Sequence, residues 1–158
     1  MGLDFLSALG DRIQLVDTVS SWQEAVKMGG QMLVEHGIAN PEYADKMIAV
    51  CQELGPYIAI APGIAIPHAR PEDGAKSFGL SLLVVKQGVE FGSHNDPVYL
   101  VLSFATPDKE SHLEFLRQLA TLLQNVEDVA RVIVDKQTPE QVRSYLQQVI
   151  TSQSNERR

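Results

Sequence analysis

Apolar residues recur at helical spacing near the start of the chain and predict its first helix. The stripe consists of Trp22, Ala25, Val26, Met32 and Leu33. Ser20 or Ser21 is a candidate N-cap, and Glu24 stands at the capping-box position. Gly37, which directly follows His36, can adopt the left-handed conformation that ends a helix.

A second helix is predicted from Asn40 to Leu54. Pro41 suits the first helical position, because its ring fixes φ near the helical value and its missing N–H needs no partner there. The apolar stripe of this helix comprises Tyr43, Ala44, Met47, Ile48, Cys51 and Leu54. Gly55 and Pro56 then end the pattern.

Continuous apolar runs in the middle of the chain predict strands. Four runs have this pattern: residues 57–61, 64–66, 79–85 and 98–104. Pro62 and Gly63 separate the first two, and Gln87 with Gly88 predicts a turn after the third. The run at residues 79–85 is almost entirely apolar, which is typical of a strand in the interior of a sheet.

Three further helical patterns follow the strands. Ser111 is the candidate N-cap of the first, residues 127–134 form the second, and Thr138 with Gln141 predicts a capping box for the third. This order of elements predicts an α/β fold (an α+β sandwich), in which a mixed central β-sheet is covered by helices on both faces. The 158 residues suit a single domain with a core of about residues 6–151 and a polar tail, residues 152–158, that frays.

The net charge narrows the range of partners. The chain has 13 basic and 20 acidic residues, which give a formal net charge of −7. A nucleic-acid binder needs a basic face that displaces counterions from phosphates, so nucleic acid is not expected as a partner. The charge suits a partner with a basic docking surface, although it also serves solubility alone.

The sequence lacks targeting features. No stretch approaches the roughly 18 apolar residues of a membrane span. Residues 1–14 include Asp4 and Asp11 and do not have the basic start and long apolar run of a signal peptide. Cys51 is the single cysteine, so no internal disulfide can form, and its apolar surroundings predict a buried structural thiol. These features predict a cytoplasmic protein.

Four histidines are the main candidates for chemistry. His36 falls in the last turn of a helix, where an imidazole suits the helix dipole, and His94 falls in a polar turn, so neither is expected in a site. Prolines on both sides of His68 present its side chain rigidly. His112 opens a helix whose free first-turn N–H groups can hold an anion. A loop or cap role is common for each alone, but together, beyond strand ends, they indicate phosphate chemistry.

Other catalytic motifs do not occur in the sequence. No two histidines have i, i+4 spacing on a helix and Cys-x-x-Cys is absent, which disfavours a zinc site. Gly-x-Ser-x-Gly is absent, which disfavours a serine hydrolase. A Walker loop and Gly-x-Gly-x-x-Gly are also absent, so neither a metal nor a cofactor is expected.

Two segments resemble a known family. Residues 63–68, Gly-Ile-Ala-Ile-Pro-His, resemble the active-site signature of mannitol/fructose-type enzyme IIA domains of the bacterial phosphoenolpyruvate-dependent sugar phosphotransferase system (PTS). Residues 111–116, Ser-His-Leu-Glu-Phe-Leu, resemble the second signature, which follows a strand end. The spacing of His68 and His112 and the order of elements agree over about residues 6–151.

Three positions indicate the branch of this family. Residues 67–72, Pro-His-Ala-Arg-Pro-Glu, resemble the ascorbate-specific branch. Mannitol- and nitrogen-related members usually have glycine in place of Ala69. Mannitol and fructose members typically carry an arginine sixteen residues before the active histidine, where this chain has Gln52. Arg70 is the nearest candidate for the missing phosphate-binding charge, and a solvent-exposed loop arginine is the alternative.

The resemblance implies a phosphoryl relay. The phosphocarrier protein HPr would phosphorylate His68, and His68 would pass the group to a IIB component for uptake of a sugar, ascorbate, through the membrane IIC component. His112 would stabilise the phosphoryl oxygens. The alternative is a regulatory IIA-like module, whose phosphorylation state controls a transporter, kinase or transcription regulator. A histidine-dependent hydrolase is a third possibility, but the sequence identifies no acidic partner for it.

Overall fold

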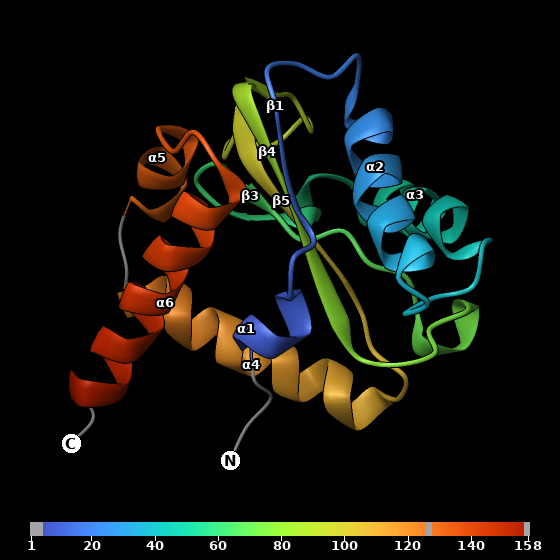
Figure 1. The fold of residues 1–158 in the computed structure, drawn as a ribbon. Helices are drawn as coiled ribbons and strands as arrows, with labels where there is room; N and C mark the ends of the chain where they lie inside the picture. Colours follow the sequence, from blue (N-terminus) through green and yellow to red (C-terminus); the bar gives the residue numbers. More distant parts are fainter. Residues whose placement is uncertain (1–4, 126–127, 157–158) are drawn as a thin grey trace.

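The computed structural model describes residues 5–125 and 128–156 (Figure 1). The elements in chain order are α1 (Phe5–Leu9), β1 (Ile13–Val16), α2 (Trp22–Glu35), α3 (Tyr43–Leu54), the 3-10 helix η1 (Gly55–Ile58), β2 (Ala59–Ala61), β3 (Ile64–Ala65), the 3-10 helix η2 (Pro71–Asp73), β4 (Gly79–Val89), β5 (Val98–Ala105), α4 (Lys109–Asn125), α5 (Val129–Val134) and α6 (Pro139–Glu156). No described helix is both long and apolar enough to cross a membrane.

The five-stranded sheet has the order β1-β4-β5-β3-β2. β4 pairs antiparallel with β5, β1 runs parallel to β4, and β3 runs parallel to β5. β2 returns antiparallel to β3. The mixed sheet is confirmed, and β4 lies inside it, as its apolar run predicts. β5 is also an interior strand. The parallel pairing of β3 and β5 places their carboxyl ends at the same edge of the sheet.

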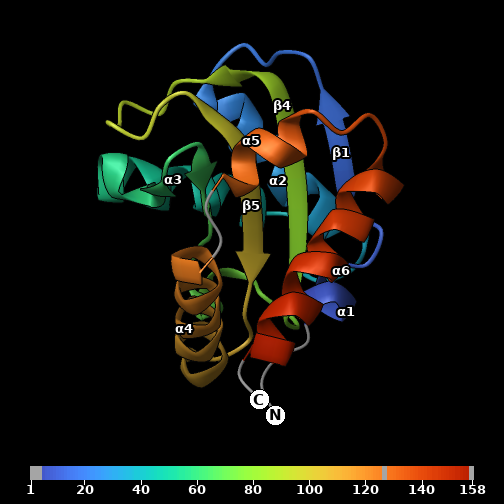
Figure 2. The ribbon, with the colours of Figure 1, turned by 90° about the vertical axis from the view of Figure 1, so that its left-hand side faces the viewer.

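Helices cover both faces of the sheet (Figures 1 and 2). One core joins α2 and α3 to strand residues that include Leu83, Val85 and Val101. A second core joins α1, α4, α5 and α6 to the intervening strand residues, among them Leu82 and Val84. Successive strand residues thus serve opposite faces, as the pleat requires. This arrangement confirms the predicted α/β fold class.

The caps predicted for α2 and α6 are confirmed. Ser21 Oγ accepts the N–H of Glu24 at 3.2 Å, and Thr138 Oγ1 accepts the N–H of Gln141 at 3.1 Å. Gly37 follows α2 with a φ of +73°, the left-handed conformation expected after a helix.

Two helix starts differ from the prediction. α3 begins at Tyr43, because Pro41 lies in a turn before the helix and not at its first position. α4 begins at Lys109, two residues before the predicted N-cap Ser111. The carboxylate of Asp108 accepts the Ser111 N–H at 2.7 Å and so caps the helix in its place.

Two strand boundaries also differ. The run at residues 57–61 is divided between η1 and β2, because Gly55, with a φ of +62°, and Pro56 lead the chain into a 3-10 turn. Gln87 and Gly88 do not form the predicted turn, since β4 continues through both. Gly88 has a φ of +81°, and the register between β4 and β5 shifts here, which is the geometry of a β-bulge.

The ends of the chain hold further differences. α1 and β1 have no counterpart in the sequence prediction, because their five and four residues are too short for a clear periodicity. The described part of the predicted tail is helical, since α6 continues to Glu156. α5 begins at Val129, and the expected start at residue 127 lies outside the described residues.

Candidate active site

The two histidine-bearing segments meet at the carboxyl edge of the sheet. His68 follows the end of β3, and His112 lies in the first turn of α4, beyond the end of β5. The Phe104 N–H donates to the Pro67 carbonyl at 3.2 Å and holds the two segments together. The ring centroids of His68 and His112 are 5.0 Å apart, with an angle of 63° between the planes. The structure therefore brings the two candidate histidines into one site.

Phe104 packs against both histidine rings. Its ring centroid lies 4.5 Å from that of His68 and 5.3 Å from that of His112. Phe104 is fully buried and packs in turn against Phe115 at 4.6 Å. A rigid aromatic side chain of β5 thus restricts the positions of both imidazoles.

Tyr43, from α3, ties together the backbone around the site. Its hydroxyl donates to the Phe104 carbonyl at 3.0 Å and accepts the Ala69 N–H at 3.1 Å. Tyr43 is fully buried, and this burial raises its pKa to about 12, so the hydroxyl stays neutral. The sequence places Tyr43 only in an apolar stripe, because helical spacing does not reveal a hydrogen bond across the core.

The hydrogen bonding of His68 distinguishes its two ring nitrogens. Nδ1 lies 2.8 Å from the Ile66 carbonyl oxygen, which can only accept, so Nδ1 carries the proton. Nε2 therefore keeps its lone pair. Burial lowers the pKa of His68 to about 4, although the Ile66 bond opposes this and nearby His112 adds to it. The ring is neutral at neutral pH, with Nε2 as an available nucleophile.

We expect the imidazole of His68 to titrate near pH 4 in the folded protein, which NMR titration of the ring nitrogens measures directly. The unfolded chain takes up this proton first, because its pKa is about 6.5. The contribution of His68 to stability is therefore complete above about pH 6.5 and is lost as the pH falls toward 4. Urea unfolding at pH 7 and 5 should show a larger loss for wild type than for His68→Gln. A midpoint above pH 6 would contradict the buried neutral state.

His112 differs from the prediction in its surroundings. Its Nδ1 lies 3.0 Å from Thr106 Oγ1, and partial burial lowers its pKa. The sequence predicts free helix N–H groups beside this ring, but the His112 N–H bonds to the Asp108 carbonyl at 3.2 Å. The Ser111 N–H bonds to the Asp108 carboxylate. The helix start is therefore already occupied by a carboxylate, and the predicted open anion site is wrong for these two groups.

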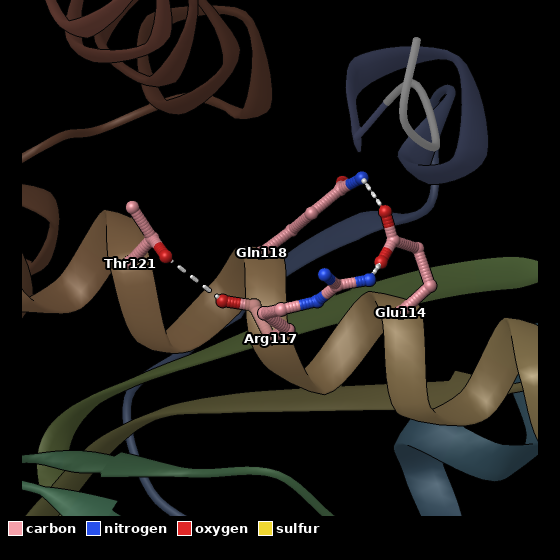
Figure 3. A network of polar contacts seen from close by, with 4 residues as sticks. All are labelled: Glu114, Arg117, Gln118 and Thr121. Atoms are coloured by element: carbon pink, nitrogen blue, oxygen red, sulfur yellow. Dashed lines mark hydrogen bonds and ion pairs between the residues drawn. The ribbon is translucent and has the colours of Figure 1, made fainter.

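Glu114, part of the second signature, belongs to a separate network along α4 (Figure 3). Arg117 donates to one carboxylate oxygen of Glu114, and Gln118 donates to the other at 3.3 Å. The next turn continues with Thr121, whose hydroxyl donates to the Arg117 carbonyl at 3.1 Å. Glu114 is thus paired with other residues along the surface of α4. The lowered pKa of His112 comes from the burial of its own ring.

Arg70 lies two residues after His68 and is exposed. Its Nη2 is 3.2 Å from Glu53 Oε2, with side-chain exposures of 58% for Arg70 and 66% for Glu53. The guanidinium therefore pairs with a carboxylate from α3 and not with a site histidine. Gln52, at the position of the family arginine, is exposed on the same helix.

The remaining candidates lie as the sequence predicts. Cys51 is buried, accepts the backbone N–H of His68, and has a pKa raised to about 12 by burial, which describes an inert structural thiol. His36 Nδ1 bonds to the Met32 carbonyl at 2.8 Å at the end of α2, and His94 is exposed in a loop. Within residues 5–125 and 128–156, no group of three or more His, Cys, Asp or Glu side chains is placed to hold a metal ion.

Known proteins resemble this chain in sequence. The family model described as "Phosphoenolpyruvate-dependent sugar phosphotransferase system, EIIA 2" matches residues 9–149. The ascorbate-specific PTS system EIIA component of Escherichia coli (strain K12) is 38% identical over 122 residues, which span 76% of this chain and 79% of that protein.

Solved structures share the fold. The mannitol-specific cryptic phosphotransferase enzyme IIA of Escherichia coli has 27% identity and a TM-score of 0.77, with 95% of this chain and 99% of that chain covered. Enzyme IIA for mannitol from Escherichia coli, solved in complex with phosphorylated enzyme IIB, has 25% identity and a TM-score of 0.73, with 85% and 93% covered. The chain therefore belongs to the EIIA 2 family of the phosphoenolpyruvate-dependent sugar phosphotransferase system.

Proposed function

We propose that this protein is a cytoplasmic IIA component that accepts a phosphoryl group from HPr on His68 Nε2 and passes it to a IIB component. The membrane IIC component would then import the sugar, which we propose is ascorbate. The observation that carries the proposal is the fixed tautomer of His68, whose protonated Nδ1 donates to the Ile66 carbonyl, beside the ring of His112. Similarity to the ascorbate-specific component supports the sugar, and the solved mannitol complex supports the IIB partner.

The site suits phosphoryl transfer between proteins. The lone pair of His68 Nε2 attacks phosphorus while the N–P bond of the donor phosphohistidine breaks, and that electron pair returns to the donor ring. His68 keeps its proton on Nδ1 during this step, and Nδ1 continues to donate a hydrogen bond to the Ile66 carbonyl. The fixed ring orientation removes the cost of aligning the nucleophile. Positioning and stabilisation of the phosphoryl charge are the main contributions that such a reaction needs.

Arg70 is part of the proposal as a phosphate-binding residue. An exposed ion pair such as Arg70 with Glu53 contributes about 1 kcal/mol or less. The guanidinium can therefore leave Glu53 for a phosphoryl group on His68 at little cost. A planar guanidinium also binds phosphate oxygens in a bidentate manner.

A labelling and transfer experiment tests the function. The protein is incubated with labelled phosphoenolpyruvate, enzyme I and HPr, and then with an ascorbate IIB component. We expect an acid-labile phosphoprotein whose label moves to IIB. Label that stays on the protein with every IIB component offered would support the regulatory alternative instead. Absence of label would overturn both.

Large apolar side chains are exposed on the segments that build the site. Those exposed by 40% or more among the described residues are Leu54, Tyr57, Ile60 and Leu113. Tyr57 precedes Ile58, whose carbonyl accepts the Ile66 N–H at 3.0 Å, and Leu113 follows His112. We propose that a protein that exchanges a phosphoryl group with His68 covers this surface, because exposed aromatic residues often dominate such interfaces.

We expect Tyr57→Ser to lower kcat/KM for transfer to IIB by roughly tenfold, because it removes an aromatic contact of the interface. The melting temperature should not change, since Tyr57 is 83% exposed and packs little in the isolated protein. Stopped-flow or quenched transfer assays give the rate. Gln147→Ser, at an exposed position of α6, is the control and should transfer normally. A Tyr57→Ser rate within twofold of wild type would exclude Tyr57 from the docking surface.

A further inference from the structure

Thr106 places a buried hydroxyl against His112. Among the described residues the buried serine and threonine side chains are Ser81, Ser103 and Thr106. Thr106 is 1% exposed, and its Oγ1 lies 3.0 Å from His112 Nδ1. This is its one side-chain hydrogen bond within the described part of the chain. The hydroxyl directly follows β5, so the sheet fixes its position.

The direction of this hydrogen bond follows from the hydroxyl proton. If His112 Nδ1 carried a proton and donated to Thr106, the buried hydroxyl proton would have no acceptor, which is costly. If Thr106 donates, Nδ1 accepts, and a neutral His112 then carries its proton on Nε2. The second arrangement satisfies both groups and is the favoured one.

We infer that Thr106 is a positioning residue that fixes His112 as the Nε2–H tautomer, so that neutral His112 can donate a hydrogen bond to a phosphoryl group on His68. The inference rests on the proposed function for the identity of the acceptor. The centroids of the two rings lie 5.0 Å apart, so a group on His68 Nε2 is within reach of His112. Nδ1 of His112 is already engaged by Thr106, which leaves Nε2 as the donor.

The tautomer matters because His112 is not expected to be charged. Partial burial disfavours its protonated form, and the imidazole of His68 next to it is buried as well. A neutral imidazole has a single N–H, so the wrong tautomer would present a lone pair to the phosphoryl oxygens. In the transfer step, the bond from His68 Nε2 to phosphorus forms as the donor N–P bond breaks. His112 only donates a hydrogen bond and keeps its proton.

NMR of the unphosphorylated protein gives the first test and needs no phosphoryl donor. Long-range nitrogen–proton correlations should show His112 protonated at Nε2 and unprotonated at Nδ1. Thr106→Val, which keeps the side-chain shape and removes the hydroxyl, should shift His112 toward a mixture of tautomers. Protonation of Nδ1 in the wild type would overturn the inference, even if His68 accepts phosphoryl groups as proposed.

Transfer rates give the second test. We expect Thr106→Val to slow labelling of His68 by about tenfold, whereas Thr106→Ser, which keeps a hydroxyl, should restore the rate to within a few-fold. Thr121→Val removes another hydroxyl of the α4 region (Figure 3) and should leave the rate and the His112 spectrum unchanged. Equal rates for Thr106→Val and wild type, or equal slowing in Thr106→Ser, would contradict the inference. Failure of the wild type to label would instead count against the proposed function.

Discussion

His68→Gln is expected to abolish phosphoryl acceptance, with a loss of roughly 10³-fold or more in the initial labelling rate. Glutamine is close to histidine in length, and its amide is uncharged, like the neutral imidazole. It has no nitrogen lone pair able to attack phosphorus. The side chain still covers Phe104, so we expect the fold to persist and the loss to be chemical.

Matched variants of the other histidines separate the loss of the nucleophile from any general effect of replacing histidine by glutamine. His36→Gln and His94→Gln alter exposed imidazoles outside the site and should label at the wild-type rate. His112→Gln should label slowly but to completion, because it removes a hydrogen-bond donor and keeps the nucleophile. Acid lability of the label and circular dichroism of each variant complete the measurement. Full labelling of His68→Gln would place the nucleophile on another residue, with His112 the first to examine.

The parts of the site that lie within one segment of sequence could be predicted. His68 follows a short apolar run between prolines, and His112 follows a long apolar run. The sequence therefore indicates both of the segments that carry the site histidines. In the structure β3 pairs with β5, and this pairing brings the two segments together. The α/β class was predictable for the same reason, since long apolar runs and helical stripes are local patterns.

The parts of the site that depend on contacts between distant segments could not be predicted. Tyr43 is 26 residues from Ala69 and 61 from Phe104, and nothing in a helical stripe distinguishes a hydrogen-bonding tyrosine from a packing one. Thr106 acts on a ring six residues away through a geometry that only the turn after β5 creates. Asp108 takes the cap predicted for Ser111, because both residue types suit an N-cap and they stand only three positions apart in the sequence.

Gly29→Ala is expected to lower the free energy of unfolding by about 2–3 kcal/mol, because it overpacks the contact between α2 and the sheet. A Cβ at position 29 would lie 2.2 Å from Ser103 Oγ and 3.1 Å from Ser103 Cβ. The Gly29 carbonyl accepts the Ser81 hydroxyl at 2.8 Å, which holds the helix at this distance. In an exposed helix the same substitution would stabilise the protein by about 0.5–1 kcal/mol. The sign of the change in the free energy of unfolding therefore shows whether the contact at Gly29 is tightly packed. Urea denaturation of the two proteins measures the difference.

Ser103 allows the cause of this destabilisation to be isolated. Its Oγ is buried and has no hydrogen-bond partner among the described residues, so Ser103→Ala should be neutral or stabilising. In the double variant the 2.2 Å clash with Oγ is gone, while the contact with Cβ at 3.1 Å remains. Gly29→Ala should therefore lower the free energy of unfolding much less in the Ser103→Ala background. A double-mutant cycle of the two substitutions should give a coupling free energy of at least about 1 kcal/mol. Additive effects would instead place the strain on the backbone of α2, away from the Ser103 hydroxyl.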